Sequence, residues 1–277
     1  MMHWFSSLSL LQVIWVLSFA SMLTLLVVLL GRDRVRRFPW FTAVTALAAL
    51  NLVVSKLLFG RLPQLEFQGV MIVLADLAGL GTLLLLLELA RNVFGGVNRR
   101  VWAGWTLILT LTGCGVLTVW GEWPAWKVLT APGLLPRLGD LQLLAVKLGL
   151  LDDVLAVGLG VLVAVFGGRF GARWRGHGQR LALGLAVSSA AKMGAEGLWQ
   201  SIAMSAKPQT MEEYQHIMGM QEKLFNASNG IYIAVLLWWI AALWLNEPRN
   251  AVQAEAVAAE PAAEPATEKP GGDQTAQ

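Results

Sequence analysis

The chain alternates between long apolar stretches and short polar connections rich in arginine, proline or glycine. A helix needs about 20 mostly apolar residues to cross the hydrocarbon core of a bilayer. Seven stretches meet this requirement, so the pattern predicts an all-α polytopic membrane protein, a seven-transmembrane-helix bundle. The expected spans are residues 8–30, 38–60, 68–90, 101–121, 142–166, 181–203 and 224–245.

The composition agrees with a chain that lies mostly in lipid. Hydrophobic residues make up 56% of the sequence and charged residues only 14%, whereas soluble domains have about 25% charged residues. Thirteen tryptophans stand against two tyrosines, and indole rings favour the membrane interface. We therefore expect a multi-pass protein of the bacterial inner (cytoplasmic) membrane, with the lipid bilayer as a partner and no nucleic acid.

Arginines are concentrated in alternate connections between the spans, and this bias predicts the orientation. They lie after the first, third and fifth spans, in the loops around Arg34, Arg99 and Arg173, while the other connections carry few basic residues. Arginine-rich connections stay in the cytoplasm. The N-terminus is therefore expected outside and the C-terminus inside, which requires an odd number of spans and agrees with seven.

The chain divides into a membrane domain and a tail. Residues 1–248 are expected to form the seven-helix domain, and residues 249–277, rich in Ala, Glu and Pro, a disordered cytoplasmic tail. No lysine or arginine precedes the first span, so we interpret it as a retained helix and not a signal peptide. One cysteine and three histidines, which are far apart in sequence, predict no disulfide, metal site or cofactor.

Ionisable residues inside the predicted spans indicate where the function lies, because charges in hydrocarbon are costly and mostly functional. They come from the second, third, fifth and sixth spans and share a similar depth, and asparagines open the seventh span at the same level. We expect a polar cavity that these five spans line and that opens outward, for ligand binding or a proton relay. The candidate residues are Lys56, Asp76, Lys147, Asp152, Asp153, Ser189, Lys192, Glu196, Gln200, Asn226 and Asn229.

The sixth span carries the clearest pattern. Ser189, Lys192, Glu196 and Gln200 follow the spacing i, i+3, i+7 and i+11, which places them on one helical face. Lys192 and Glu196 are four residues apart and can pair directly, so they form either a structural bridge or part of a site. In the fifth span a ridge of small residues predicts the close approach of another helix: Gly149, Ala156, Gly160 and Ala164, with Asp153 among them.

The stretch LLLLLELAR places Glu88 and Arg91 at the end of the third span. The two residues lie on neighbouring helical faces, and arginine can extend its charged end to the headgroups. We expect an interfacial Glu88–Arg91 ion pair.

Four motifs resemble an uncharacterised family of bacterial seven-transmembrane-helix proteins: RRFPWFTA before the second span, ELAR after the third, QRLALGLA before the sixth, and NGIYIAVLLWWIAALW followed by NEP at the seventh. The resemblance covers about residues 1–248 and implies the fold but no activity. The chain does not fit the microbial rhodopsins, because residues 224–245 contain no lysine that could carry retinal.

Three hypotheses remain for the function. The first is binding or sensing of a small polar or amphipathic ligand in the outer-half cavity, with a signal passed to a separate cytoplasmic or membrane protein. The second is a proton-coupled transporter or carrier, because buried carboxylates beside lysines are typical of proton relays. The third is a structural or assembly role. Beyond these three, an intramembrane enzyme that uses an Asp or Glu as acid or base is a further alternative, although no spacing of residues supports a specific reaction and no catalytic residue is predicted.

Overall fold

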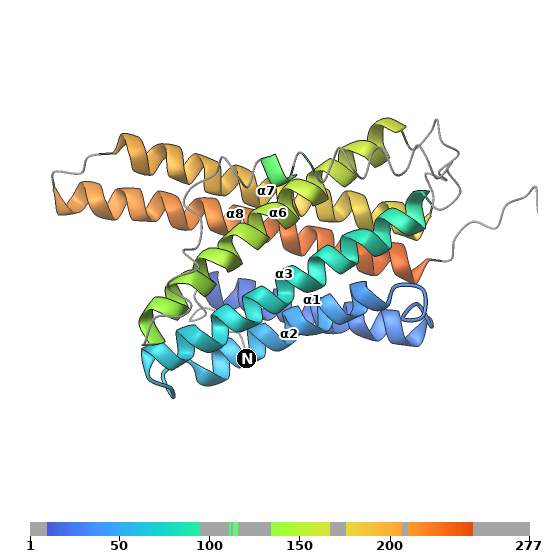
Figure 1. Cartoon of the computed structure of the whole chain (residues 1–277), viewed down its shortest axis with the longest axis horizontal. Helices are drawn as coiled ribbons and strands as arrows, with labels where there is room; N and C mark the ends of the chain where they lie inside the picture. The colour runs from blue at the N-terminus through green and yellow to red at the C-terminus, as the bar shows by residue number, and fades with distance from the viewer. Residues whose placement is uncertain are drawn as a thin grey trace, which may run out of the picture. The chain divides into compact units, whose positions relative to one another are not determined.

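The computed structural model describes residues 10–94, 111, 113–115, 134–166, 176–206 and 210–245. Within these ranges every regular element is a helix, as predicted for an all-α protein. The long helices are α1 (Leu10–Gly31), α2 (Pro39–Leu58), α3 (Gln64–Phe94), α6 (Leu134–Phe166), α7 (His177–Ser205) and α8 (Met211–Trp244), shown in Figure 1.

Five of these helices are long and apolar enough to cross a membrane: α1, α2, α3, α6 from Leu138 to Val165, and α8. The protein is therefore an all-α, multi-pass membrane protein. α7 coincides with the predicted sixth span but is more polar, and it is not among the five. The predicted fourth span lies almost wholly outside the described residues, although Leu111 and residues 113–115 are helical, and the predicted tail lies outside them too.

Four helices begin earlier than the apolar pattern predicts. α3 begins at Gln64, α6 at Leu134, α7 at His177 and α8 at Met211, whereas the expected spans begin at residues 68, 142, 181 and 224. At α8 the cause is a capping box. The Thr210 hydroxyl accepts a hydrogen bond from the Glu213 backbone N–H, and the Glu213 carboxylate accepts one from the Thr210 N–H. This cap starts a polar helical segment that hydropathy alone does not detect.

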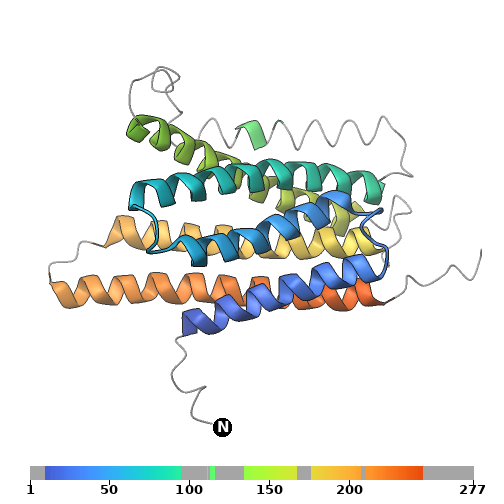
Figure 2. The same cartoon turned by 90° about the horizontal axis from the view of Figure 1, so that it is seen from below.

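The six long helices form a ring of neighbours in the order α1, α2, α3, α6, α7, α8 and back to α1, and α3 also packs on α7. Figures 1 and 2 show α7 and α8 side by side, with α1 beside α8. The ring encloses one apolar core, in which Leu25, Leu89, Leu181, Leu236 and Leu243 are almost completely buried.

The helix ends that flank the arginine-rich connections lie at one end of this ring. The Arg32 guanidinium, after α1, lies 4.9 Å from the ring centroid of Trp244 at the end of α8. At the same end, Gly178 in the first turn of α7 packs against Asn92 of α3 and Phe38, which precedes α2. The described helix ends that flank the basic connections therefore lie on one side, and the position of the connections themselves stays a prediction. We call this side the arginine end.

α3 and α6 run in the same direction. Gly69 and Leu138 are neighbours near the start of both helices, and Gly79 and Leu148 are neighbours ten residues further along each. The chain therefore leaves α3 at the arginine end and enters α6 at the opposite end. Between the two helices in sequence, Gly113 faces Leu151 and Leu155 of α6.

Candidate functional site

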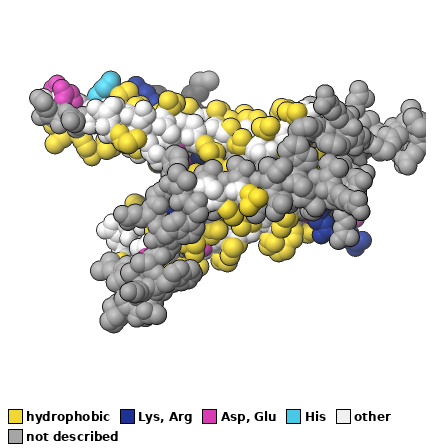
Figure 3. Space-filling model, turned by 45° about the horizontal axis from the view of Figure 1, so that its top comes forward, with side chains coloured by type: hydrophobic (Ala, Val, Ile, Leu, Met, Phe, Trp, Pro, Cys, Tyr) yellow, Lys and Arg dark blue, Asp and Glu magenta, His cyan; other side chains and the backbone are white. Residues whose placement is uncertain are grey.

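A cavity of about 660 Å³ lies between α3, α6 and α7. Its lining covers residues 67–75 of α3, 142–150 of α6 and 192–200 of α7. Each stretch rises eight residues, or about 12 Å at 1.5 Å per residue. Since α7 runs opposite to the other two, the three stretches match in depth. In Figure 3 the surface is hollowed between the projecting ends of α7 and α8, at the upper left, and the helices below them.

The cavity has an apolar side and a polar side. α3 and α6 supply mostly apolar side chains, among them Phe67, Met71, Ile72, Leu143, Val146 and Leu150. α7 supplies Lys192, Glu196 and Gln200, spaced by one turn each. Such a combination, a mostly apolar wall with a few polar groups, is typical of sites for small organic molecules.

Four candidate residues from the sequence line this cavity: Lys147, Lys192, Glu196 and Gln200. Two lining amides, Gln68 and Gln142, were not predicted from the sequence. They are the first residues of the expected third and fifth spans, where a polar side chain is ordinarily interfacial. α3 and α6 both begin before these residues, so the amides lie within the helices and line the cavity.

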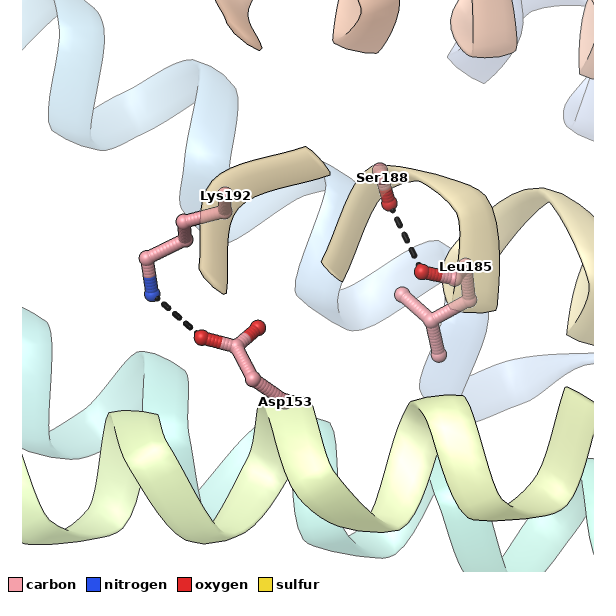
Figure 4. Close-up of polar contacts among 4 residues, drawn as sticks. All are labelled: Asp153, Leu185, Ser188 and Lys192. Atoms are coloured by element: carbon pink, nitrogen blue, oxygen red, sulfur yellow. Dashed lines mark hydrogen bonds and ion pairs between the residues drawn. The ribbon is translucent and has the colours of Figure 1, made fainter. Parts of the chain in front are cut away.

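An ion pair between α6 and α7 forms the deep end of the cavity. The Lys192 Nζ atom lies 2.7 Å from Oδ2 of Asp153 and donates a hydrogen bond to it, as Figure 4 shows. The Asp153 side chain is only 11% exposed, whereas that of Lys192 is 48% exposed and lines the cavity. Gly149, one turn before Asp153, lies close to the ammonium group. The lysine thus enters the helix interface at a place where α6 has small residues.

The direct Lys192–Glu196 pair that the spacing permits does not form in the structure. Lys192 turns across the helix interface to Asp153. Among the described residues, Glu196 makes no ion pair, and its side chain is part of the cavity wall. Lys192 pairs with Asp153 because a buried carboxylate is more costly to leave without a cation than a partly exposed glutamate.

Toward the arginine end from this ion pair, the helices pack without space for extra atoms. A Cβ atom on Gly160 of α6 would overlap Ala186 of α7. A Cβ atom on Gly184 of α7 would overlap the indole of Trp239 of α8. This confirms the predicted close approach along the small-residue ridge, at Gly160. The cavity therefore ends at the ion pair and does not continue through the bundle at these contacts.

Two further carboxylates lie next to the deep end of the cavity. Asp152 is 7% exposed and points toward Gly79 of α3, opposite to its neighbour Asp153. Asp76 directly follows Ala75, the deepest cavity residue of α3. In the described part of the chain, one oxygen of each carboxylate is buried without a hydrogen-bond partner. A buried oxygen of this kind is costly unless the group is protonated or gains a partner.

The remaining candidate residues lie away from the cavity wall. Ser189 is buried on α7 one turn below Lys192, and Lys56 is exposed in the last turn of α2. Asn226 and Asn229 lie on α8, which packs on α7 and α1. Of the five spans expected to line the cavity, the third, fifth and sixth do so; α2 and α8 supply none of its described lining.

The expected Glu88–Arg91 pair is wrong. Oε2 of Glu88 accepts a hydrogen bond of 3.0 Å from the backbone N–H of Phe41, in the first turn of α2. Helix N-termini have free N–H donors and a partial positive charge, so a carboxylate from a neighbouring helix is stabilised there. Arg91 remains exposed. Glu88 thus caps the N-terminus of α2, and the sequence around Glu88 gives no sign of this long-range contact.

No protein-family model, curated protein or solved structure matches this chain. The resemblance to bacterial seven-helix proteins stays a prediction, and the function has to be argued from the site.

Proposed function

We propose that the protein crosses the membrane seven times, with the arginine end in the cytoplasm. The parallel directions of α3 and α6 support this count, because the segment between them has to return from one end of the bundle to the other. Its apolar stretch at residues 101–121 is long enough to do so. The arginines support the orientation, and the cavity then opens toward the outside.

We further propose that the cavity binds a small amphipathic molecule. The observation that carries this proposal is the division of the cavity into an apolar side on α3 and α6 and a polar side on α7. A volume of about 660 Å³ suits a small organic ligand. Bound beside the Lys192–Asp153 pair, the ligand would change how α6 and α7 pack, and a separate cytoplasmic or membrane protein at the arginine end would receive the signal.

A thermal-unfolding screen tests the binding proposal. The protein is purified, placed in lipid nanodiscs and heated with small polar and amphipathic compounds. A compound at 100 times its Kd should stabilise the folded state by about 2.7 kcal/mol. The gain should vanish in Glu196→Ala, which alters the cavity wall, and persist in Glu222→Ala, which alters an exposed glutamate of α8. Equal stabilisation of both variants would contradict binding in this cavity.

A proton-coupled carrier is the second candidate. The observation in its favour is that Asp76 and Asp152, next to the cavity's deep end, each have one buried oxygen without a hydrogen-bond partner among the described residues. Such a carrier would have to open the packing at Gly160 and Gly184 during its cycle. Proton flux in vesicles that is lost in Asp76→Asn and Asp152→Asn would favour it over the receptor. A purely structural role would leave both the screen and the flux assay without an effect.

A further inference from the structure

The numbers of acidic and basic side chains around the cavity are unequal. Four carboxylates, Asp76, Asp152, Asp153 and Glu196, lie in its wall or next to its deep end, against two lysines, Lys147 and Lys192. Lys147 is only 6% exposed and presents little of its surface to the cavity. The charge of Lys192 is engaged by Asp153 at 2.7 Å. The site thus contains more carboxyl groups than lysines.

Glu196 is the acidic group that a ligand can reach. It lies one turn outward from Lys192 on the polar side of the cavity, and it forms no ion pair with any described residue. The amide side chains of Gln68, Gln142 and Gln200 belong to the same lining. Phe67 is also in the lining, and aromatic rings attract organic cations.

We propose that the ligand is an amphipathic cation, with its charged group bound at Glu196 and its apolar part against α3 and α6. This inference rests on the proposed binding function and names the chemical class of the ligand. A carboxylate in a partly dehydrated cavity is stabilised when a cation approaches it. An anionic ligand would face Glu196, and Lys192, the more exposed of the two lining lysines, is already paired with Asp153. A neutral ligand would leave Glu196 without a charged partner.

Three probes with the same six-carbon chain separate these classes: hexyltrimethylammonium, hexanoate and 1-hexanol. Each is titrated against the protein in nanodiscs of zwitterionic lipid, and the thermal unfolding midpoint gives the apparent Kd. The variants are Glu196→Gln, Lys192→Gln and the matched control Glu222→Gln. Effects of the probes on the bilayer are equal for all variants and cancel in the comparison.

The expected result is stabilisation by hexyltrimethylammonium and none by hexanoate. Binding of the cation should weaken about tenfold in Glu196→Gln, because a charge-assisted interaction is lost, and stay unchanged in Glu222→Gln. Lys192→Gln should bind the cation more tightly, since Asp153 then lacks its own cation. If Lys192→Gln does not fold, the comparison of Glu196→Gln with Glu222→Gln still tests whether the cation binds at Glu196.

Two results would overturn the inference. One is stronger stabilisation by hexanoate or hexanol than by the cation. The other is an unchanged affinity for the cation in Glu196→Gln. Either would leave the cavity as a binding site for another class of ligand, provided that the broader compound screen yields a ligand that depends on Glu196. If that screen yields none either, the binding proposal itself fails.

Discussion

At the scale of single residues, the pairing of Lys192 with Asp153 decides what the cavity contains. Because Lys192 turns to α6, its neighbour Glu196 remains in the cavity wall. The sequence placed both residues on the correct face of the helix, but it could not choose between two carboxylates within reach of the same lysine. That choice depends on the distance and burial of Asp153, which lies 39 residues earlier in the chain.

A double-mutant cycle tests this pair. Asp153→Leu leaves the Lys192 ammonium without its partner, and Lys192→Leu leaves a carboxylate that is only 11% exposed. Removing one member of a buried pair is strongly destabilising, so each single change should lower the unfolding midpoint. The double variant should be more stable than the sum of both effects predicts, with a coupling of about 1–3 kcal/mol. Additive effects would contradict the pair.

Glu88 gives a second test at this scale. In Glu88→Ala the Phe41 N–H loses its acceptor, and loss of a helix cap costs about 1 kcal/mol. Glu88→Gln keeps an acceptor oxygen and should be less destabilising. Glu66→Ala, at an exposed position in the first turn of α3, the helix that carries Glu88, serves as the control. If chemical denaturation ranks Glu66→Ala as the more destabilising change, Glu88 does not act as the cap.

At the scale of the helices, glycines fix how closely α6, α7 and α8 pack. Trp239 of α8 covers Gly184 and also meets Phe41 edge to face, with 5.2 Å between the ring centroids. Since Phe41 is capped by Glu88, side chains of α2, α3, α7 and α8 meet in one continuous set of contacts near the arginine end. These contacts lie toward the arginine end from the cavity.

Two glycines of α7 allow a matched comparison. Gly184→Ala would place a methyl group in the Trp239 indole, and this overpacking should cost about 1–3 kcal/mol. Gly194 has no atom within 4 Å of the position that a Cβ would take. Gly194→Ala should therefore be neutral or stabilising, because alanine favours the helix by up to about 1 kcal/mol. Equal midpoints for both variants in a thermal melt would contradict the close contact.

The positions of the helices followed from hydropathy, but their full lengths did not. The expected spans 8–30 and 38–60 agree closely with α1 and α2, because those helices end where the apolar residues end. α8 begins 13 residues before residue 224 (224 − 211), and the signal for this was present as Thr210 followed by Glu213 three residues later. A span rule that counts only apolar residues cannot detect a helix that continues into water.

At the scale of the whole molecule, the bundle has a proposed orientation in the membrane and a cavity away from the arginine end. The contacts at the arginine end follow from the charge pattern of the sequence, and the depth of the ionisable residues pointed to the outer half. The sequence could not show which helices are neighbours. It therefore assigned α2 and α8 to the cavity, although α2 packs on α1 and α3, and α8 packs on α7 and α1.

Cysteine labelling along α7 from outside the cell tests the proposed cavity and its orientation together. In a Cys114→Ser background, single cysteines replace Gly197 or Gln200, which line the cavity, or Leu198, which is exposed but does not line it. A membrane-impermeant methanethiosulfonate reagent reacts with thiolates, and these form in water and not in hydrocarbon. Gly197 and Leu198 are adjacent, so they differ in facing but hardly in depth.

We expect Gly197→Cys and Gln200→Cys to react in intact cells and Leu198→Cys to remain unlabelled. That pattern would establish a water-filled cavity on this face of α7 that opens outward. Equal reactivity at Gly197 and Leu198 would contradict the cavity, and labelling of Gly197→Cys only in inverted membranes would contradict the orientation.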